Sequence, residues 1–419
     1  MEFVLGVLLA GVLTVLALNL ASRQKSVEHH IQHHVAAADR RFQRELELLV
    51  GPAFLDGNVA TNLENGDEIF PAMLDAVRGA RCSINFETFI YWSGRIGREF
   101  AEALAERARA GVEVRVILDW LGSKKMEDEL LELMRSAGAH VVRFHRPHWY
   151  TLARMNNRTH RKLLIVDGTL GFTGGVGIAD EWLGRAQDPD HWRDSHYRIA
   201  GPVVAQIQAA FIENWLEATG ELLTGDAFFP PLQAVGTARM QFFTSSPNGG
   251  ADSMELMYVL SIAAAQHSID ITAAYFLPDD LMCRALIEAR RRGVRVRILA
   301  PGKHIDRRIA RLASRDDWGP LLEAGIEIHE FEPTMLHCKL LVVDRHVASV
   351  GSTNFDPRSL HLNAEANLNI ADSGFAQRLT QVFEQDLARS HRVKLSDWSH
   401  RPLRVRLVER VSSLVQPQL

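Results

Sequence analysis

The sequence is poor in cysteine. Its 419 residues contain three cysteines, Cys82, Cys283 and Cys338, which lie far apart and are odd in number. They form no zinc-ligand spacing and no disulfide framework, so the sequence excludes a zinc-finger or disulfide-stapled protein and favours a reducing compartment. Cys338 stands between His337 and Lys339. Side chains alternate along a strand, so we expect Cys338 to point into the core, away from both neighbours.

An excess of charge of either sign is also missing. The chain has 47 Lys and Arg against 51 Asp and Glu, a formal net charge of -4. This balance argues against a protein built to coat nucleic acid, although it leaves a local basic cleft open. The hydrophobic content of 47% and charged content of 23% are those of a globular protein. The length suffices for about two domains.

A long hydrophobic run occurs at the N-terminus, where Phe3 to Leu20 is apolar except for Thr14 and Asn19. As a helix this run is about 27 Å long, close to the thickness of the bilayer core. A cleaved signal peptide is the alternative, but signal peptides typically have positively charged residues before the apolar run. Basic residues instead follow it. We therefore predict a transmembrane anchor at residues 1–22, with the remainder in the cytoplasm.

Residues 23–50 are predicted to form a juxtamembrane helix. The pairs His29/His33 and His30/His34 are four residues apart and share helix faces. Such pairs can bind zinc or copper. Because no acidic or cysteine partner lies in a suitable position, we interpret the segment as a polar helix and predict no metal site.

The remaining sequence is internally duplicated. SINFETFIYW (83–92) matches SIDITAAYFL (268–277), AGVEVRVILD (110–119) matches RGVRVRILAP (292–301), and AGAHVVRFH (137–145) matches AGIEIHEFE (324–332). Strands alternate with helices in each half, which predicts α/β layered domains with a largely parallel sheet. Prolines interrupt the pattern at residues 226–236. We place one domain at residues 51–230 and a second at residues 231–419.

One motif occurs in both halves. HRKLLIVD contains His160, Lys162 and Asp167, and HCKLLVVD contains His337, Lys339 and Asp344. Both have the form H-x-K-x4-D around an apolar strand. A single copy would be read as an ordinary strand with a charged start, because short patterns are common. Two chance copies in one chain are improbable, so the pair points to a shared function.

Two histidines and two lysines in one cleft suit a phosphodiester. The lysines can neutralise the phosphate, which is worth most where water is excluded. One histidine can attack phosphorus while the other protonates the leaving oxygen. Free histidine titrates near pH 6.5, so it can serve either role. The set demands no metal and no cofactor.

Further polar residues follow each motif. Ser352 and Asn354 lie in a glycine-containing turn and can donate to phosphate oxygens, whereas Gly177 stands where the second half has Asn354. Asp194 and Glu365 each come about thirty residues after their motif histidine. An acid that accepts from the second ring nitrogen would fix the histidine tautomer. A surface salt bridge is an equally good interpretation of each acid.

At this point the sequence resembles the phospholipase D superfamily, whose signature is H-x-K-x4-D followed by G-S-x-N or G-G-x-N. The first copy reads HRKLLIVD with TGGVG, and the second HCKLLVVD with GSTN. The resemblance covers nearly everything after Gly51. Within the superfamily the chain looks most similar to bacterial cardiolipin synthases, through stretches such as GFTGGVGIADEW, HWRDSHYRIAGP and GSTNFDPRSLHLNAEANL.

The resemblance implies a monomer with two tandem, pseudo-twofold-related α/β/α sandwich domains and one site at their interface. It implies that His160 is the nucleophile and His337 the general acid and base. Lys162, Lys339 and Asn354 would hold the phosphate. The remaining residues would support the site: Asp194, Glu365, Ser352, Asp167, Asp344. Of these, Asp167 and Asp344 belong to the catalytic motif, although we expect them to support the site and not to touch substrate.

The resulting hypothesis is a cardiolipin synthase-type phosphatidyltransferase. It would move a phosphatidyl group from phosphatidylglycerol, or phosphatidylethanolamine, to a hydroxyl of another phosphatidylglycerol through a phosphohistidine. The alternatives are a phospholipase D hydrolase and a membrane-anchored phosphodiesterase or nuclease. The expected partners are phospholipids and the bacterial inner membrane, and no nucleic acid.

Two other stretches are candidates for lipid contact. Tyr91, Trp149 and Tyr275 are aromatic residues that can line a lipid-facing groove. The C-terminal RPLRVRLVERVSSLV mixes arginines with leucine and valine. A segment of this kind can lie on an anionic bilayer. It can equally be a final element packed on the second domain.

Overall fold

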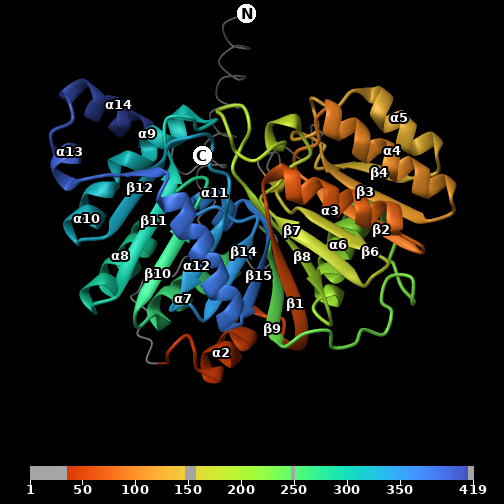
Figure 1. The fold of residues 1–419 in the computed structure, drawn as a ribbon, viewed down its shortest axis with the longest axis horizontal. Helices are drawn as coiled ribbons and strands as arrows, with labels where there is room; N and C mark the ends of the chain where they lie inside the picture. The colour runs from red at the N-terminus through yellow and green to blue at the C-terminus, as the bar shows by residue number, and fades with distance from the viewer. Residues whose placement is uncertain (1–34, 147–156, 247–250, 414–419) are drawn as a thin grey trace, which may run out of the picture.

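The computed structural model describes residues 35–146, 157–246 and 251–413. Their strands form one mixed sheet of 16 strands (Figure 1). The strands of the first half are β1 (Leu55–Glu64), β2 (Ser83–Thr88), β3 (Glu113–Asp119), β4 (His140–Phe144), β5 (Arg158–Thr159), β6 (Leu163–Val166), β7 (Leu170–Gly174) and β8 (Ser195–Ala200). Those of the second half are β9 (Ala238–Ser245), β10 (Ser268–Thr272), β11 (Arg295–Pro301), β12 (Glu327–Phe331), β13 (Leu340–Val343), β14 (Val347–Gly351), β15 (Asn363–Ala371) and β16 (Ser390–Arg392).

The two halves repeat one strand order outward from the middle of the sheet. The first half runs β1-β8-β7-β6-β2-β3-β4, and the second runs β9-β15-β14-β13-β10-β11-β12, with β16 added at its edge. β1 and β9 pair antiparallel and join the halves. The duplication read from the sequence is therefore present in the fold.

The prediction of a largely parallel sheet is wrong. Only β2-β3-β4, β10-β11-β12 and the two-residue pair of β5 with β15 run parallel among the described strands, and the strands between the first two sets are antiparallel. Each motif strand is followed within a few residues by its neighbour, β6 by β7 and β13 by β14. Such a short connection permits only an antiparallel hairpin, because a parallel pair needs a crossover of a dozen or more residues.

Helices cover both faces of the sheet. Those of the first half are α2 (Arg40–Val50), α3 (Asn65–Gly79), α4 (Arg95–Arg109), α5 (Asp128–Ser136), the 3₁₀ helix η2 (Asp180–Trp182) and α6 (Val204–Thr219). Those of the second half are α7 (Ala251–Ala264), α8 (Asp280–Arg291), α9 (Arg308–Asp316), α10 (Trp318–Glu323), α11 (Pro357–His361), α12 (Ser373–Leu387), α13 (Leu395–Ser399) and α14 (Leu403–Ser413).

Three hydrophobic cores hold these layers together. One packs α3, α4 and α5 against the first half of the sheet, and another packs α7, α8 and α10 against the second half. The third extends across both halves, where Phe211 of α6 and Phe383 of α12 share a cluster with strands from each. The motif strands β6 and β13 lie inside the sheet and are buried along their whole length. This position explains their uninterrupted apolar sequence.

The N-terminal predictions are answered only in part. α2 buries Phe42 and Leu46 in the core of the second half, so residues 40–50 pack on the folded protein instead of standing apart from it. No helix within the described ranges is long and apolar enough to cross a bilayer. The predicted anchor at residues 1–22 lies outside those ranges, as do His29, His30, His33 and His34. The domain limits at residues 50 and 230 stay predictions.

Candidate active site

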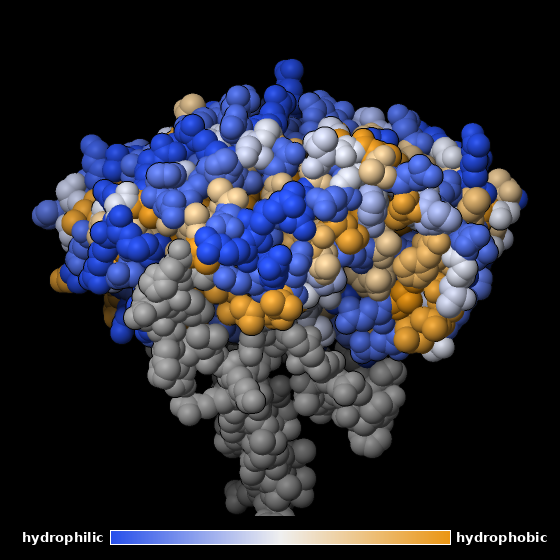
Figure 2. All heavy atoms as spheres, turned by 90° about the horizontal axis from the view of Figure 1, so that it is seen from below, coloured by the Kyte–Doolittle hydropathy of each residue, from blue (hydrophilic) through white to orange (hydrophobic). Residues whose placement is uncertain are grey.

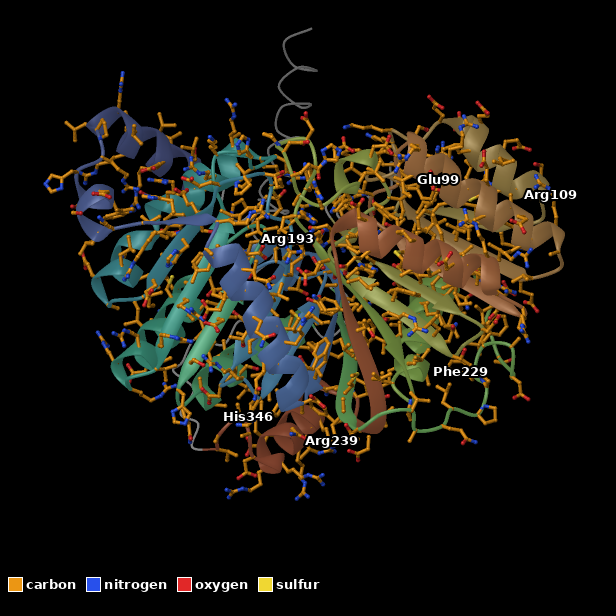
Figure 3. The ribbon with its side chains drawn as sticks, viewed as in Figure 1. Glu99, Arg109, Arg193, Phe229, Arg239 and His346 are labelled. Carbon is orange, nitrogen blue, oxygen red and sulfur yellow. The ribbon has the colours of Figure 1, made fainter. Side chains whose placement is uncertain are left out.

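The two motif histidines line one cavity. His160 and His337 stand just before β6 and β13, and both face a cavity of about 410 Å³. Lys162 and Asn354 line it as well. Beside the cavity, Arg193 connects the two halves; Figure 3 labels this residue near the middle of the molecule. Arg193 is buried, forms a backbone bridge with Leu336, and its Nε donates to Asp386 at 2.9 Å.

Each histidine is held by the acid of the opposite half. Nδ1 of His160 lies 2.9 Å from the carboxylate of Glu365 on β15, and Nδ1 of His337 lies 2.8 Å from Oδ2 of Asp194, just before β8. Both acids are completely buried, so the surface salt-bridge interpretation is wrong. With Nδ1–H donating to the acid, Nε2 carries the lone pair that can meet phosphorus.

The lysines are arranged alike in the two halves. Lys162 Nζ donates to the backbone oxygen of His160 at 2.7 Å, and Lys339 Nζ donates to that of His337 at 2.6 Å. Lys339 Nζ also lies 3.0 Å from Nδ1 of His337. Burial lowers the pKa of both lysines. An anion in the cavity would favour their charged forms.

The two histidine–acid pairs differ electrostatically. Burial lowers the pKa of His160 well below its usual value, and Lys162 and Lys339 add to that effect. Burial and Lys339 also lower the pKa of His337, but Asp194 opposes them. Burial alone would raise the pKa of Asp194, yet the charges of His337 and Lys339 bring it below its usual value. In the other pair, burial raises the pKa of Glu365.

Ser352 is placed differently from the prediction. Its hydroxyl donates to Oε2 of Glu365 at 2.5 Å and accepts from the backbone N–H of Ala366, so it supports the acid and is not directed at phosphate. The corresponding donor in the first half is Trp182, whose Nε1 donates to Oδ2 of Asp194 at 2.8 Å. Trp182 was missed because its partner is evident only in three dimensions.

Gly177 lies where there is no space for a side chain. A Cβ there would lie 2.8 Å from Cβ of Ile90 and 3.2 Å from the ring of Trp182. The place that Asn354 occupies in the second half is thus filled by apolar groups in the first. Asn354 lines the cavity, and its buried Oδ1 has no hydrogen-bond partner among the described residues.

Asp167 and Asp344 do not belong to the cavity, and the structure corrects their inclusion in the catalytic set. Both follow the motif strands, at the opposite end from the histidines. Asp167 accepts from the backbone N–H groups of Arg81, Cys82 and Ser83 at 2.7–3.1 Å. Asp344 does the same for residues 266–268. These carboxylates fix the start of β2 and β10.

The aromatic candidates separate into core and cavity. Tyr91 is fully buried and donates to the backbone oxygen of Gly97, so its assignment to a lipid groove is wrong. Tyr275 lines the cavity, and Trp149 lies outside the described residues. The sequence analysis missed other wall residues. Phe89 stands edge-on to His160, and Trp182 and Trp192 pack against His337.

Comparison with known proteins agrees with this architecture. The family model described as cardiolipin synthase, PLD-like domain, matches residues 73–215 and 258–387. The two matched segments contain His160 and His337. The chain belongs to the cardiolipin synthase family of phospholipase D-like proteins.

Members of this family resemble the chain over most of its length. A cardiolipin synthase of Geobacillus thermodenitrificans is 37% identical over 85% of this chain and 72% of its own. Cardiolipin synthase 2 of Staphylococcus epidermidis is 33% identical over 90% of this chain and 79% of its own. The crystal structure of a phosphatidylserine synthase from Haemophilus influenzae superposes with a TM-score of 0.69 at 15% identity, over 91% of this chain and 99% of the other, which establishes the shared fold.

Proposed function

We propose that the protein is a phosphatidyltransferase that makes cardiolipin from two molecules of phosphatidylglycerol. The observation that carries the proposal is the pair of histidines that line one cavity, each hydrogen-bonded to a buried acid of the other half. Membership of the cardiolipin synthase family selects the lipid substrates from the phosphodiesters that such a site could accept.

In the first step, Nε2 of His160 attacks the phosphorus of the donor. The bond from phosphorus to the glycerol oxygen breaks, and His337 gives that oxygen its proton. The lowered pKa of His160 keeps its imidazole neutral and nucleophilic. Burial lowers the pKa of His337 as well, but the charge of Asp194 opposes that shift and stabilises the protonated ring that serves as the acid. Lys162, Lys339 and Asn354 stabilise the charge that develops on the phosphate oxygens.

In the second step, a terminal hydroxyl of another phosphatidylglycerol attacks the phosphohistidine. The bond from phosphorus to nitrogen breaks, and His337 takes the hydroxyl proton. The sum is one cardiolipin and one glycerol from two phosphatidylglycerols. Phosphatidylethanolamine as donor would release ethanolamine instead.

A bacterial inner-membrane location, a single N-terminal anchor, cytoplasmic catalytic domains and a monomeric state belong to the same proposal. The location and the anchor rest on the apolar run at residues 3–20 and on the lipid substrates, and the monomeric state rests on the resemblance to the phospholipase D superfamily. The apolar wall of the cavity, with Phe89, Trp92 and Leu121 among its residues, suits acyl-glycerol better than a nucleotide chain.

A lipid product assay tests the function. The full chain in detergent receives labelled phosphatidylglycerol, with and without phosphatidylethanolamine, beside a Lys162→Ala/Lys339→Ala variant. Lys303→Ala/Lys394→Ala is the matched control, because both of these lysines are exposed and outside the cavity. Cardiolipin made by wild type and control, but not by the first variant, supports the proposal. If phosphatidic acid is the sole product, the protein is a hydrolase. If neither cardiolipin nor phosphatidic acid is formed, a nuclease activity becomes the better hypothesis.

A further inference from the structure

The cavity carries more positive charge than one phosphate requires. Six Lys or Arg side chains line it against two Asp side chains, and the buried Asp119 lies 3.9 Å from one of the six, Arg158. The six cations are Lys124, Lys125, Arg158, Lys162, Arg307 and Arg358. Of these, only Lys162 belongs to the motif that holds the reacting phosphate. The other five positively charged side chains have no role in the chemistry derived above.

Three of these cations come together from different elements. Arg158 is buried on β5 and pairs through its backbone with Asn363 at the start of β15. Arg358 lies on α11, directly before that strand. Arg307 precedes α9 and acts electrostatically on His160. Burial and the charges of Arg307 and Arg158 lower the pKa of Arg358, although Asp356 opposes them. Guanidinium groups keep their charge in such surroundings.

We infer that Arg158, Arg307 and Arg358 form a second anion subsite that binds the phosphate of the acceptor lipid. The inference rests on the proposed function. An acceptor phosphatidylglycerol has its own phosphate one glycerol unit away from the hydroxyl that reacts. That phosphate must enter the cavity with the hydroxyl, and planar guanidinium groups match phosphate oxygens in pairs. The subsite would favour a phospholipid acceptor over water or a neutral alcohol.

Competition between two acceptors tests this subsite. Labelled phosphatidylglycerol is supplied with a monoalkylglycerol, which offers a similar diol without a phosphate. Both acceptors draw on the same phosphohistidine, so the ratio of cardiolipin to phosphatidyl-alkylglycerol reports the acceptor step alone. We expect Arg307→Gln and Arg358→Gln each to lower this ratio about tenfold, the loss of one charge-assisted hydrogen bond. Arg307→Lys keeps the positive charge, so its ratio should fall less than that of Arg307→Gln.

Arg308→Gln is the matched control, because Arg308 is the next residue, is exposed and does not line the cavity. An unchanged ratio in both Arg307→Gln and Arg358→Gln, whatever their overall rates, would overturn the inference. An equal fall in the Arg308→Gln control would do the same. If the wild-type protein makes no cardiolipin at all, the proposed function itself has failed.

A second inference comes from α14, whose two buried side chains, Glu409 and Ser412, are both polar. Glu409 is completely buried and pairs with Arg315 at 3.3 Å and with Arg401 at 2.8 Å, where α14 packs along α9. The apolar side chains point outward. Leu403, Leu407 and Val411 recur every four residues and are 80%, 66% and 58% exposed. A helix packed on a soluble protein ordinarily has the reverse arrangement.

We propose that α14 rests on the surface of an anionic bilayer. Arg404, Arg406 and Arg410 are exposed beside the apolar stripe and complement anionic headgroups. α9, against which α14 packs, begins next to Arg307 of the cavity. The other exposed leucine pair, Leu48 and Leu49 of α2, lies at the far end of the molecule in Figure 1. The face seen in Figure 2, at that end, mixes hydrophilic residues with separate hydrophobic patches.

Fluorescence in proteoliposomes tests this orientation. The full chain with Cys82→Ser, which removes the exposed cysteine, carries an environment-sensitive label at Leu407→Cys or, as control, at Leu48→Cys. Vesicles contain phosphatidylethanolamine and brominated phosphatidylglycerol. We expect bromine to quench the label at position 407 several-fold more than that at position 48. Equal quenching, or none at position 407, would overturn the proposal.

Discussion

Nδ1 of His160 lies 2.9 Å from the carboxylate of Glu365, although 205 residues separate the two. The reciprocal pair joins His337 to Asp194 across 143 residues. Each half therefore supplies the acid that orients the histidine of the other. A half of this protein has a histidine and a lysine but lacks the acid that holds them, so the site depends on both halves.

Each acid should be required to hold its histidine in the tautomer that has the proton on Nδ1 and the lone pair on Nε2. Glu365→Gln removes the charged acceptor at His160, and we expect the rate of phosphoenzyme formation to fall about 10- to 100-fold. Rapid-quench measurement with labelled phosphatidylglycerol checks this. Glu332→Gln, on the exposed surface, serves as control. A Glu365→Gln protein that forms phosphoenzyme at the control rate would contradict the cross-paired assignment.

The two histidines should fail in different ways. His160→Ala should form no phosphoenzyme with any donor. His337→Ala lacks the proton donor, so it should still form phosphoenzyme when the donor has an acidic leaving group that departs without protonation. Acid-labile label trapped on each variant measures this difference. Label trapped on His160→Ala would reverse the roles of the two histidines.

Asp167 should matter for stability. Asp167→Ala leaves the N–H groups of residues 81–83 without their acceptor, and we expect the free energy of unfolding to fall by about 1–3 kcal/mol. Asp167→Asn should cost less, because asparagine keeps an acceptor oxygen and tolerates the left-handed φ of 52°. Urea unfolding measures both changes. A stable Asp167→Ala protein without phosphoenzyme would instead point to a direct catalytic role.

Gly177 should resist substitution. The Cβ of Gly177→Ala would lie 2.8 Å from Cβ of Ile90, and we expect this overpacking to destabilise the protein by about 1–3 kcal/mol. Gly79→Ala is the matched comparison, because a Cβ at that helical position meets nothing within 4 Å. Thermal unfolding of the two variants gives the difference. Equal melting temperatures would mean that the first half has space for a Cβ at position 177.

His196 should make stability depend on pH. Burial lowers the pKa of His196 to about 4, so below its ordinary pKa the unfolded chain binds a proton that the folded protein does not. Stability then rises with pH, and this residue alone should account for a loss of about 2 kcal/mol between about pH 7 and pH 5. Denaturant titrations of wild type and His196→Gln measure it. A loss of the same size in the variant would assign the effect to other groups.

The sequence by itself determined the duplicated α/β architecture, the two motif strands and the family. Apolar runs bounded by polar residues specify local structure, and a pattern found twice is hard to produce by chance. The histidines and lysines were identifiable for the same reason, since they lie two residues apart just before a strand and each motif is contained in a single segment.

Only the tertiary structure decided which acid holds which histidine, where Asp167 and Asp344 lie, and that Trp182 serves Asp194 as Ser352 serves Glu365. The apolar pattern also left sheet direction open, because parallel and antiparallel central strands are equally apolar; the short connections after the two motif strands were the one local signal of antiparallel pairing. These relationships join residues that are distant in the chain. They arise because β8 and β15 lie near the middle of the sheet, where Asp194 and Glu365 meet the histidines of the opposite halves, and no local pattern records that arrangement.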